Sequence, residues 1–234
     1  MHSTLERIVN KIGEKSLRDK VAAFVENPTI EIESKVYSGL QLDVSPAGLS
    51  HHHGYAGGFI EHVSATAEIA LTLCNVVKKV YHGKIDRDIV VAGVILHDLF
   101  KPLTYVEREN GKYETTPLGE RLDHLTLIVS ELVRRGFPLN LVHIVASHMG
   151  WQGSPIGPRT IEALVVHLAD LADSKLNGEV IRAAQFLSRY SAGIELERLT
   201  AQEAFEIVHA KTTQGWEGVG KSIERIRQIR LKTD

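Results

Sequence analysis

His97 and Asp98 stand side by side at the end of the apolar run of residues 89–96, and Lys101 follows three residues later. Two metal-binding side chains at the end of a buried helix are unfavourable to desolvate unless a partner satisfies them. The simpler alternative is a helix end with a solvated histidine, an aspartate cap and a lysine favoured by the helix dipole. The choice depends on partners elsewhere in the chain.

Other predicted helices offer such partners. Each places a metal-binding side chain near one end or on an apolar face: His62 in residues 59–81, His124 in about 120–135, His148 in 139–149, and Asp170 in the helix that begins near 159. Imidazole and carboxylate together suit iron, manganese, zinc or similar divalent ions rather than calcium. A structural zinc site is usually rich in cysteine and locally spaced, which this set is not.

Six side chains are more than one ion with open positions needs. Two ions bridged by one carboxylate would use them all, and Asp98 is the natural bridge because its neighbour His97 already faces a metal. The sequence therefore predicts a centre of two divalent ions, with iron or manganese favoured and zinc, nickel, cobalt or magnesium as alternatives. The predicted ligands are His62, His97, Asp98, His124, His148 and Asp170.

The composition excludes several classes of protein. Net charge is −2, and the 27 basic and 29 acidic residues are mixed, which gives no general field for nucleic acid or a membrane. The single cysteine, Cys74, excludes a disulfide framework and suits a reducing compartment. The chain begins without an apolar signal region and has no run of about 18 apolar residues. We expect a cytoplasmic protein that does not cross a membrane.

The remaining pattern is mostly helical. Residues 3–26 predict two short amphipathic helices, residues 30–37 alternate as strands do, and residues 103–119 predict a hairpin or flap turning at Asn110-Gly111. Pro102 is expected to block helix continuation, and residues 151–158 are irregular by composition. We expect an all-α bundle with a small β-hairpin, as one domain: N-terminal elements in 1–45, the metal-binding core in 50–178 and further helices in 179–234.

The order of these side chains carries a family resemblance. His62, His97-Asp98, His124, His148 and Asp170, with Lys101 three residues after the first aspartate, resemble the HD superfamily of metal-dependent phosphohydrolases in its dinuclear version. The resemblance implies an HD-domain helical bundle and a phosphohydrolase activity. It covers roughly residues 50–178.

Local motifs are closer to one group within the superfamily, the HD module of YhaM-type 3′→5′ exoribonucleases. The motifs that match are Ser50-His51-His52-His53-Gly54-Tyr55, Gly57-Gly58, Glu61-His62, Ser147-His148, Gly153-Ser154-Pro155, Pro158-Arg159-Thr160, Glu162-Ala163 and Asp170-Leu171-Ala172-Asp173-Ser174-Lys175. By size and architecture the chain is also similar to the archaeal HD phosphodiesterase that opens a dihydroneopterin 2′,3′-cyclic phosphate in methanopterin biosynthesis.

Two departures from the exonuclease pattern affect the expected substrate. Those enzymes carry a nucleic-acid-binding OB domain before the HD module, and residues 1–45 are too short for its five-stranded barrel. Phe100 also occupies a position that is usually small in the family, so the turn that delivers Lys101 is expected to differ. We therefore expect a small phosphorylated substrate rather than a long nucleic acid.

Several side chains remain as candidates beside the metal ligands. Lys101 is expected to clamp a phosphate, the alternative being a solvated lysine at a helix end. At least one of His51, His52 and His53 is expected to face the substrate, with His52 and His53 favoured. Arg159 and Lys175 are further candidate phosphate contacts, although Arg159 could merely cover a turn. Asp173 and His167 are expected to support the ligands, and His143 to support them or pack in the core.

These expectations define a leading hypothesis and three alternatives. The leading hypothesis is a metal-dependent phosphodiesterase that hydrolyses a phosphodiester or cyclic phosphate of a nucleotide-like or pterin-like molecule, with Asp98 and Lys101 as catalytic side chains. The alternatives are a 3′→5′ exoribonuclease, a di-iron HD oxygenase and a non-catalytic nucleotide-binding regulator. Oxygen consumption would identify the oxygenase, and the complete ligand set disfavours the regulator. A homo-oligomer is left open.

Overall fold

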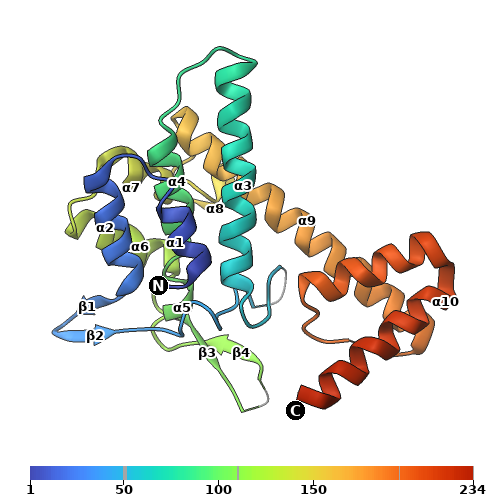
Figure 1. Ribbon diagram of the computed structural model, residues 1–234. Coiled ribbons are helices and arrows are strands. Elements are labelled where there is room, and N and C mark those ends of the chain that lie inside the picture. Colours follow the sequence, from blue (N-terminus) through green and yellow to red (C-terminus); the bar gives the residue numbers. More distant parts are fainter. Residues whose placement is uncertain (50–51, 110, 195, 234) are drawn as a thin grey trace.

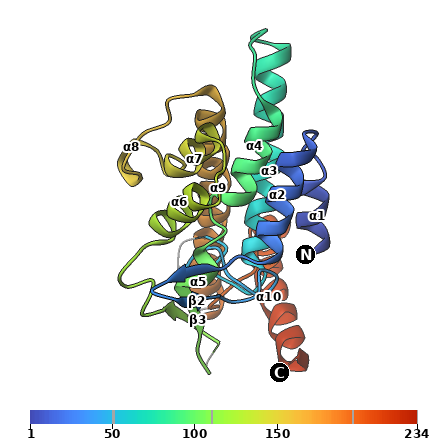
Figure 2. The same cartoon turned by 90° about the vertical axis from the view of Figure 1, so that its left-hand side faces the viewer.

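The computed structural model describes residues 1–49, 52–109, 111–194 and 196–233, and most of them lie in helices (Figure 1). Three helices that contact one another form the centre. They are α3 (Gly58–Lys79), α4 (Arg87–Leu96) and α9 (Ile161–Ala192). Figure 2 shows α1 (Ser3–Val9) and α2 (Lys15–Glu26) on one side of this centre, and α6 (His124–Arg134) and α7 (Leu139–Ala146) on the other. The all-α expectation is confirmed.

Helix α4 lies in the core because residues 89–96 are apolar or glycine at every position, and all eight are buried. The carboxylate of Asp86 caps its first turn by accepting from the backbone N–H groups of Asp88 and Ile89. Gly93 permits close packing, since an added Cβ would lie 2.5 Å from the Cγ2 atom of Ile144 on α7. The end of α4 therefore delivers His97 and Asp98 to the middle of the molecule.

Two small antiparallel hairpins complete the core region. In the first, β1 (Ile30–Ile32) pairs with β2 (Lys35–Tyr37). In the second, β3 (Tyr105–Glu107) pairs with β4 (Tyr113–Thr115), so the flap expected in residues 103–119 is present. Asn110 of its expected turn lies outside the described residues, and Gly111 has the positive φ of 68° that glycine adopts without strain.

Three helix boundaries differ from the predicted ones. Helix α6 begins at His124 rather than near residue 120, because the carboxylate of Asp123 accepts from the N–H of Thr126 and caps it there. Helix α7 ends at Ala146, where the hydroxyl and the backbone N–H of Ser147 both donate to the carbonyl of His143, so His148 lies beyond the helix. Residues 151–158 were expected to be irregular, but the first three of them belong to the short helix α8 (Gly150–Gly153).

Pro102 also has a different place from the expected one. Helix α4 ends at Leu96, before the proline, and Pro102 lies inside the short helix α5 (Lys101–Thr104). A proline is tolerated in the first turn of a helix because its missing N–H would have no partner there. The buried side chain of Phe100 precedes this turn and packs edge-on against Phe24 of α2, with ring centroids 5.5 Å apart. This packing accommodates the large residue at position 100.

The C-terminal part forms a lobe around the second half of α9 (Figure 1). Helix α9 continues without a break past residue 178, and α10 (Ala201–Thr233), which is kinked at Gly215, folds back against it. The lobe has its own apolar cluster, whose members are Tyr55, Ile181, Ala184, Leu196, Leu199, Ala204, Ile207, Val219, Ile223 and Ile226. Tyr55 ties this cluster to the core. Among the described residues, no helix has the length and apolar character needed to cross a membrane.

Candidate metal centre

The six side chains predicted as metal ligands come together in the fold. His62 is in the second turn of α3, His97 and Asp98 follow α4, His124 begins α6, His148 follows α7, and Asp170 lies on α9. His62, His97, Asp98 and His148 are buried, whereas 15% of the His124 side chain and 16% of the Asp170 side chain are exposed. Among the six proposed ligands, His124 and Asp170 are therefore the ones that solvent reaches.

Three of these residues form a first group that could hold an ion: His62, His97 and Asp170. The Nε2 atom of His62 lies 3.1 Å from the Nε2 atom of His97 and 3.4 Å from the Oδ1 atom of Asp170. The Oδ2 atom of Asp98 is close to the same group, 3.3 Å from Nε2 of His62 and 3.4 Å from Nε2 of His97.

The other carboxylate oxygen of Asp98 faces a second group. Its Oδ1 atom lies 3.2 Å from Nε2 of His124 and 3.5 Å from Nε2 of His148. These three residues could also hold an ion. Asp98 therefore stands between the two groups and turns one oxygen to each.

The space between the two groups contains buried polar atoms with few hydrogen-bond partners. Both carboxylate oxygens of Asp98 and the Nε2 atom of His124 are buried, and apart from the ion pair of Oδ2 with Lys101 they have no hydrogen-bond partner within the described part of the chain. A buried carboxylate with few donors is destabilising, since water no longer solvates it. A bound cation would satisfy these atoms, so the donor set fits divalent metal ions.

Backbone and carboxylate acceptors orient three of the imidazole rings. Nδ1 of His97 donates to the carbonyl of Val94 at 2.7 Å, and Nδ1 of His148 donates to the carbonyl of Val145 at 2.8 Å. In both cases the acceptor is the carbonyl three residues earlier, which a helix end leaves free. Such bonds fix the tautomer that presents the Nε2 lone pair to a metal.

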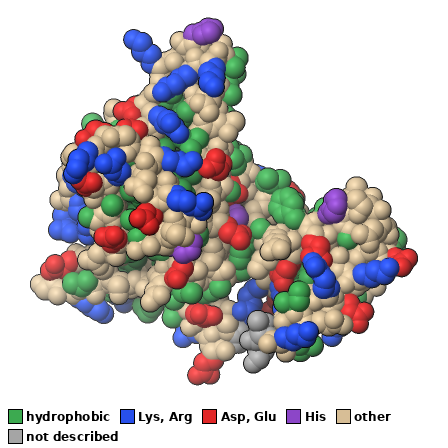
Figure 3. All heavy atoms as spheres, viewed as in Figure 1, with side chains coloured by type: hydrophobic (Ala, Val, Ile, Leu, Met, Phe, Trp, Pro, Cys, Tyr) green, Lys and Arg blue, Asp and Glu red, His purple; other side chains and the backbone are tan. Residues whose placement is uncertain are grey.

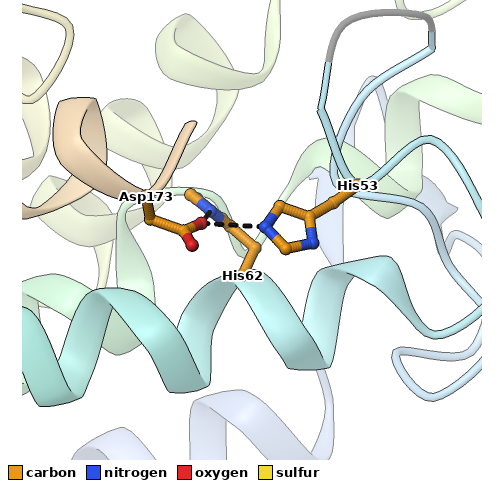
Figure 4. Close-up of side chains that lie close together, drawn as sticks. All are labelled: His53, His62 and Asp173. Atoms are coloured by element: carbon orange, nitrogen blue, oxygen red, sulfur yellow. Dashed lines mark hydrogen bonds and ion pairs between the residues drawn. The ribbon is translucent and has the colours of Figure 1, made fainter. Parts of the chain in front are cut away.

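The third ring is held by Asp173, as Figure 4 shows. The Oδ2 atom of Asp173 accepts from Nδ1 of His62 at 2.7 Å and from Nε2 of His53 at 2.9 Å. Burial opposes ionisation of Asp173, but the hydrogen bonds from His53 and His62 outweigh it and lower the pKa of this carboxyl. Asp173 therefore lies behind His62, in the supporting position expected for it.

Lys101 lies against Asp98 on the inside of the site. Its Nζ atom is 2.5 Å from the Oδ2 atom, and 13% of its side chain is exposed. Burial opposes a charge on Lys101, but Asp98, Tyr105 and Asp170 raise the pKa of the ammonium above its ordinary value. Burial likewise opposes ionisation of Asp98, yet Lys101 and the histidines hold the pKa of Asp98 well below its ordinary range.

The candidate substrate histidines have different positions. His51 lies outside the described residues. His52 lies beside the centre, with its ring centroid 5.5 Å from that of His62, and burial together with the charge of Lys101 lowers the pKa of His52 to about 4. His53 is buried instead, between Asp173 and the hydroxyl of Tyr55, with its backbone N–H donating to the side chain of Asn177.

Arg159 and Lys175 do not join the cluster. Arg159 is exposed before α9, and the nine residues from Ile161 to Asp170 span about 14 Å of helix. Its backbone N–H donates to Nε2 of His143. Lys175 is exposed five residues after Asp170, which is about 140° around the helix, so it projects from another face.

Tyr55 and Asn177 have roles that the sequence did not predict, whereas His167 was expected as a supporting residue. Asn177 follows Asp173 by four residues, so helical spacing could have placed it on the same face of α9. Tyr55 gave no such signal, because only the fold brings it to His53 and Glu61. Nδ1 of His167 donates to the backbone carbonyl of His148 at 2.7 Å.

Comparison with known proteins identifies the same region. The HD domain family matches residues 59–174. The chain is 38% identical over 225 residues to the dihydroneopterin 2′,3′-cyclic phosphate phosphodiesterase of Methanocaldococcus jannaschii. The aligned residues make up 96% of this chain and 88% of that protein. No solved structure matches.

The alignments with exoribonuclease relatives cover a smaller share of those proteins than the alignment with the phosphodiesterase does. The 3′-5′ exoribonuclease YhaM of Bacillus velezensis is 31% identical over 196 residues, or 76% of this chain and 58% of that protein. YhaM of Bacillus subtilis is 32% identical over 171 residues, or 68% and 50%. The chain therefore spans half or slightly more of these exoribonucleases.

The chain belongs to the HD domain family. Within that family it is a metal-dependent phosphohydrolase, which confirms the leading hypothesis at the level of the enzyme class. The comparisons favour this activity over the oxygenase and the non-catalytic regulator.

Proposed function

We propose that this enzyme opens the cyclic phosphate of a small heterocyclic substrate, using two divalent ions, with iron or manganese favoured. The observation that carries the proposal is the position of Asp98, which turns one buried oxygen to each of two ligand groups. A carboxylate in this position could contribute an oxygen to an ion in each group.

The proposed ligands divide between the two groups around Asp98. His62, His97 and Asp170 would hold one ion, and His124 and His148 the other. Two ions bound there would supply an activated water at neutral pH and neutralise charge on the phosphoryl group. The protein contributes the fixed orientation of the imidazoles and a largely buried site that excludes bulk water.

Lys101 is the side chain proposed to contact the phosphate. Its ammonium stays charged beside Asp98 and carries donors for a phosphate oxygen. Charge develops on the oxygens around phosphorus as the ester bond breaks, and an ammonium already in place stabilises it without reorganisation. Asp98 would contribute an oxygen to each ion and, through its ion pair, keeps Lys101 in place.

His52 remains the proposed substrate contact among the three successive histidines. Its lowered pKa keeps the ring neutral at pH 7, so it can donate or accept a hydrogen bond without adding charge. His53 is better assigned to holding Asp173, since both of its ring nitrogens have partners. Arg159 and Lys175 are left out of the proposed site because of their positions on the surface.

A small substrate is favoured over a long nucleic acid. Tight binding of RNA requires a track of basic residues. The net charge of this chain is −2, and the face in Figure 3 carries basic and acidic side chains mixed together. The phosphodiesterase relative, matched over 88% of its length, acts on dihydroneopterin 2′,3′-cyclic phosphate, which is the specific substrate we propose for testing.

The test compares diesters of different size. Anaerobically purified protein is loaded with Fe²⁺ or Mn²⁺ and given dihydroneopterin 2′,3′-cyclic phosphate, the four nucleoside 2′,3′-cyclic phosphates and a short RNA oligomer. We expect a phosphomonoester product from the pterin compound, loss of activity with a chelator, and an affinity that depends weakly on salt. Oxygen consumption, measured in parallel, should be absent.

Two controls define the result. Asp98→Asn should lose the activity, whereas Asp19→Asn, a change of the same kind on the exposed face of α2, should retain it. Processive shortening of the RNA, with binding that falls steeply between low and moderate salt, would contradict the proposal and favour an exoribonuclease.

A further inference from the structure

A cavity of about 260 Å³ is lined in part by His52, which is a neighbour of His62 in the metal centre. Its walls come from four segments: the loop that holds His52 and Tyr55, strand β4 at Tyr113, helix α9 at Ile181 and Gln185, and the segment before α10 at Glu197. Only the packing of the C-terminal lobe against the core creates it. At about 30 Å³ per water molecule, the cavity has room for roughly nine waters.

Two residues connect this cavity to the proposed reaction site. His52 lines the cavity and lies beside His62 of the metal centre. Tyr55 also lines it and contacts His53, which in turn holds Asp173. A ligand in the cavity would therefore contact His52, the side chain that lies between the cavity and the metal centre.

Part of the cavity lining suits a planar ring. Tyr113 offers an aromatic face, and its hydroxyl is tied to the backbone carbonyl of Val44 at 3.1 Å, which fixes the ring. Ile181 adds an apolar wall from α9. Stacking on a fixed aromatic ring is a common way to bind heterocycles.

Polar groups at the far end suit a ring with an amide-like edge. Gln185 is half-buried, and its side chain makes no hydrogen bond with the described part of the chain. An amide both donates and accepts, so it can pair with a ring N–H and its adjacent carbonyl. The carboxylate of Glu197 lines this end together with Lys112 and Arg198, and it lies 3.4 Å from Nζ of Lys112, while Arg198 donates to the backbone carbonyl of Gly111.

We propose that this cavity binds the nitrogen heterocycle of the substrate, and that the side-chain amide of Gln185 forms hydrogen bonds with the 2-amino-4-oxo edge shared by pterins and guanine. The inference rests on the proposed function, whose cyclic phosphate it places at Lys101. Gln185 lies three helical turns beyond Asp173, or about 18 Å along α9, and its side chain slopes back toward the N-terminus of the helix. The ligand must therefore be elongated, with a short linker between ring and phosphate.

The first test measures binding of the ring alone. Neopterin, which has no phosphate, is titrated into chelator-treated full-length protein and followed by its fluorescence. We expect saturable binding to the wild type, about ten-fold weaker binding to Gln185→Ala, and competition by guanosine but not by adenosine. Gln152→Ala, which alters an exposed glutamine on α8, is the matched control and should bind as the wild type does.

The second test separates ring recognition from chemistry. Steady-state rates are compared on dihydroneopterin 2′,3′-cyclic phosphate and on propane-1,2-diol cyclic phosphate, which has the reacting group without a ring. Gln185→Ala should lower the ratio of the two kcat/KM values about ten-fold, mainly through the KM of the pterin compound. Gln152→Ala should leave the ratio unchanged.

The outcomes distinguish the two proposals. Hydrolysis of neither cyclic phosphate by the wild type would overturn the proposed function, while the neopterin titration would still test the cavity. Unchanged neopterin binding in Gln185→Ala, or an equal loss of kcat/KM on both substrates, would overturn the assignment of the cavity. Equal competition by adenosine and guanosine would overturn the role of Gln185 as the reader of that edge.

Discussion

The Nε2 atoms of His62 and His97 lie 3.1 Å apart, and the other nitrogen of each ring is already a donor to oxygen. If both rings are neutral, two lone pairs face each other in a buried place, which is repulsive. A proton on one ring or a cation beside both removes that repulsion. The pair therefore has the geometry of a site where a proton and a metal ion compete.

This competition predicts that metal binding depends on pH. Without an ion, burial opposes protonation of His62, but Asp173, Asp98 and Asp170 raise its pKa to about 9. This raised pKa stabilises the ion-free fold below the ordinary histidine pKa near 6.5, and the contribution is lost as pH rises through about 9. Metal binding must release the proton, so affinity should rise about ten-fold per pH unit between pH 6 and 8. Calorimetry in buffers of different ionisation enthalpy should detect the released proton, and a pH-independent affinity would contradict this account.

Removal of the Asp98 carboxylate should abolish both metal binding and turnover. Asp98→Ala takes away the proposed bridge and leaves the buried ammonium of Lys101 without its partner, which also lowers stability. Metal content after dialysis, activity and the melting temperature with and without chelator are the measurements. The wild type should melt at a lower temperature after chelation, whereas the variant should not respond. Near-normal metal content and turnover in Asp98→Ala would refute the bridging role.

The two groups around Asp98 should lose metal independently. His124→Ala or His148→Ala removes a donor facing Oδ1 and should leave about one ion per chain, with most of the rate lost. His62→Ala should disrupt the other group. Metal analysis of each variant, with the exposed His82→Ala as control, gives the count. If both His124→Ala and His148→Ala retained two ions, these histidines would not be metal ligands and would serve only in packing.

Glu131 should contribute stability that depends on acid pH. This buried carboxylate on α6 accepts from Arg134 and Arg135, and these bonds outweigh burial and lower its pKa. A lowered pKa adds stability above the unfolded value near 4.3, and that stability is lost as pH falls through the folded pKa. Glu131→Gln should therefore lower the free energy of unfolding by about 1.5–3 kcal/mol at pH 7 and by less at pH 3. Urea denaturation at both pH values, with exposed Glu224→Gln as control, measures the difference, and a constant deficit would contradict this cause.

The sequence alone was enough to predict the helical class and the six side chains that converge. The ligands are spread over residues 62–170, but each lies at the end or on the apolar face of a helix, and helices with apolar faces must pack together. A polar side chain on such a face is carried into the interior with it. The flap was likewise predictable, because alternation and a glycine turn are local signals.

Helical periodicity could also have excluded Lys175, since five residues from Asp170 place it on another face of α9. His148 could not have been placed in this way, because the end of α7 depends on the hydroxyl of Ser147 and on the packing of the next turn. Helix ends are decided by competition among nearby hydrogen-bond partners, which periodicity does not contain.

Tertiary structure alone decided the roles of residues brought together from distant segments. His52 and His53 are neighbours in sequence, yet one lies beside the cavity and the other is buried against Asp173, 120 positions away. The cavity at Gln185 exists because α9 continues into the C-terminal lobe and Glu197 meets the flap at Lys112. Local sequence determines which face of an element is polar, whereas the packing of elements distant in the chain determines what that face meets.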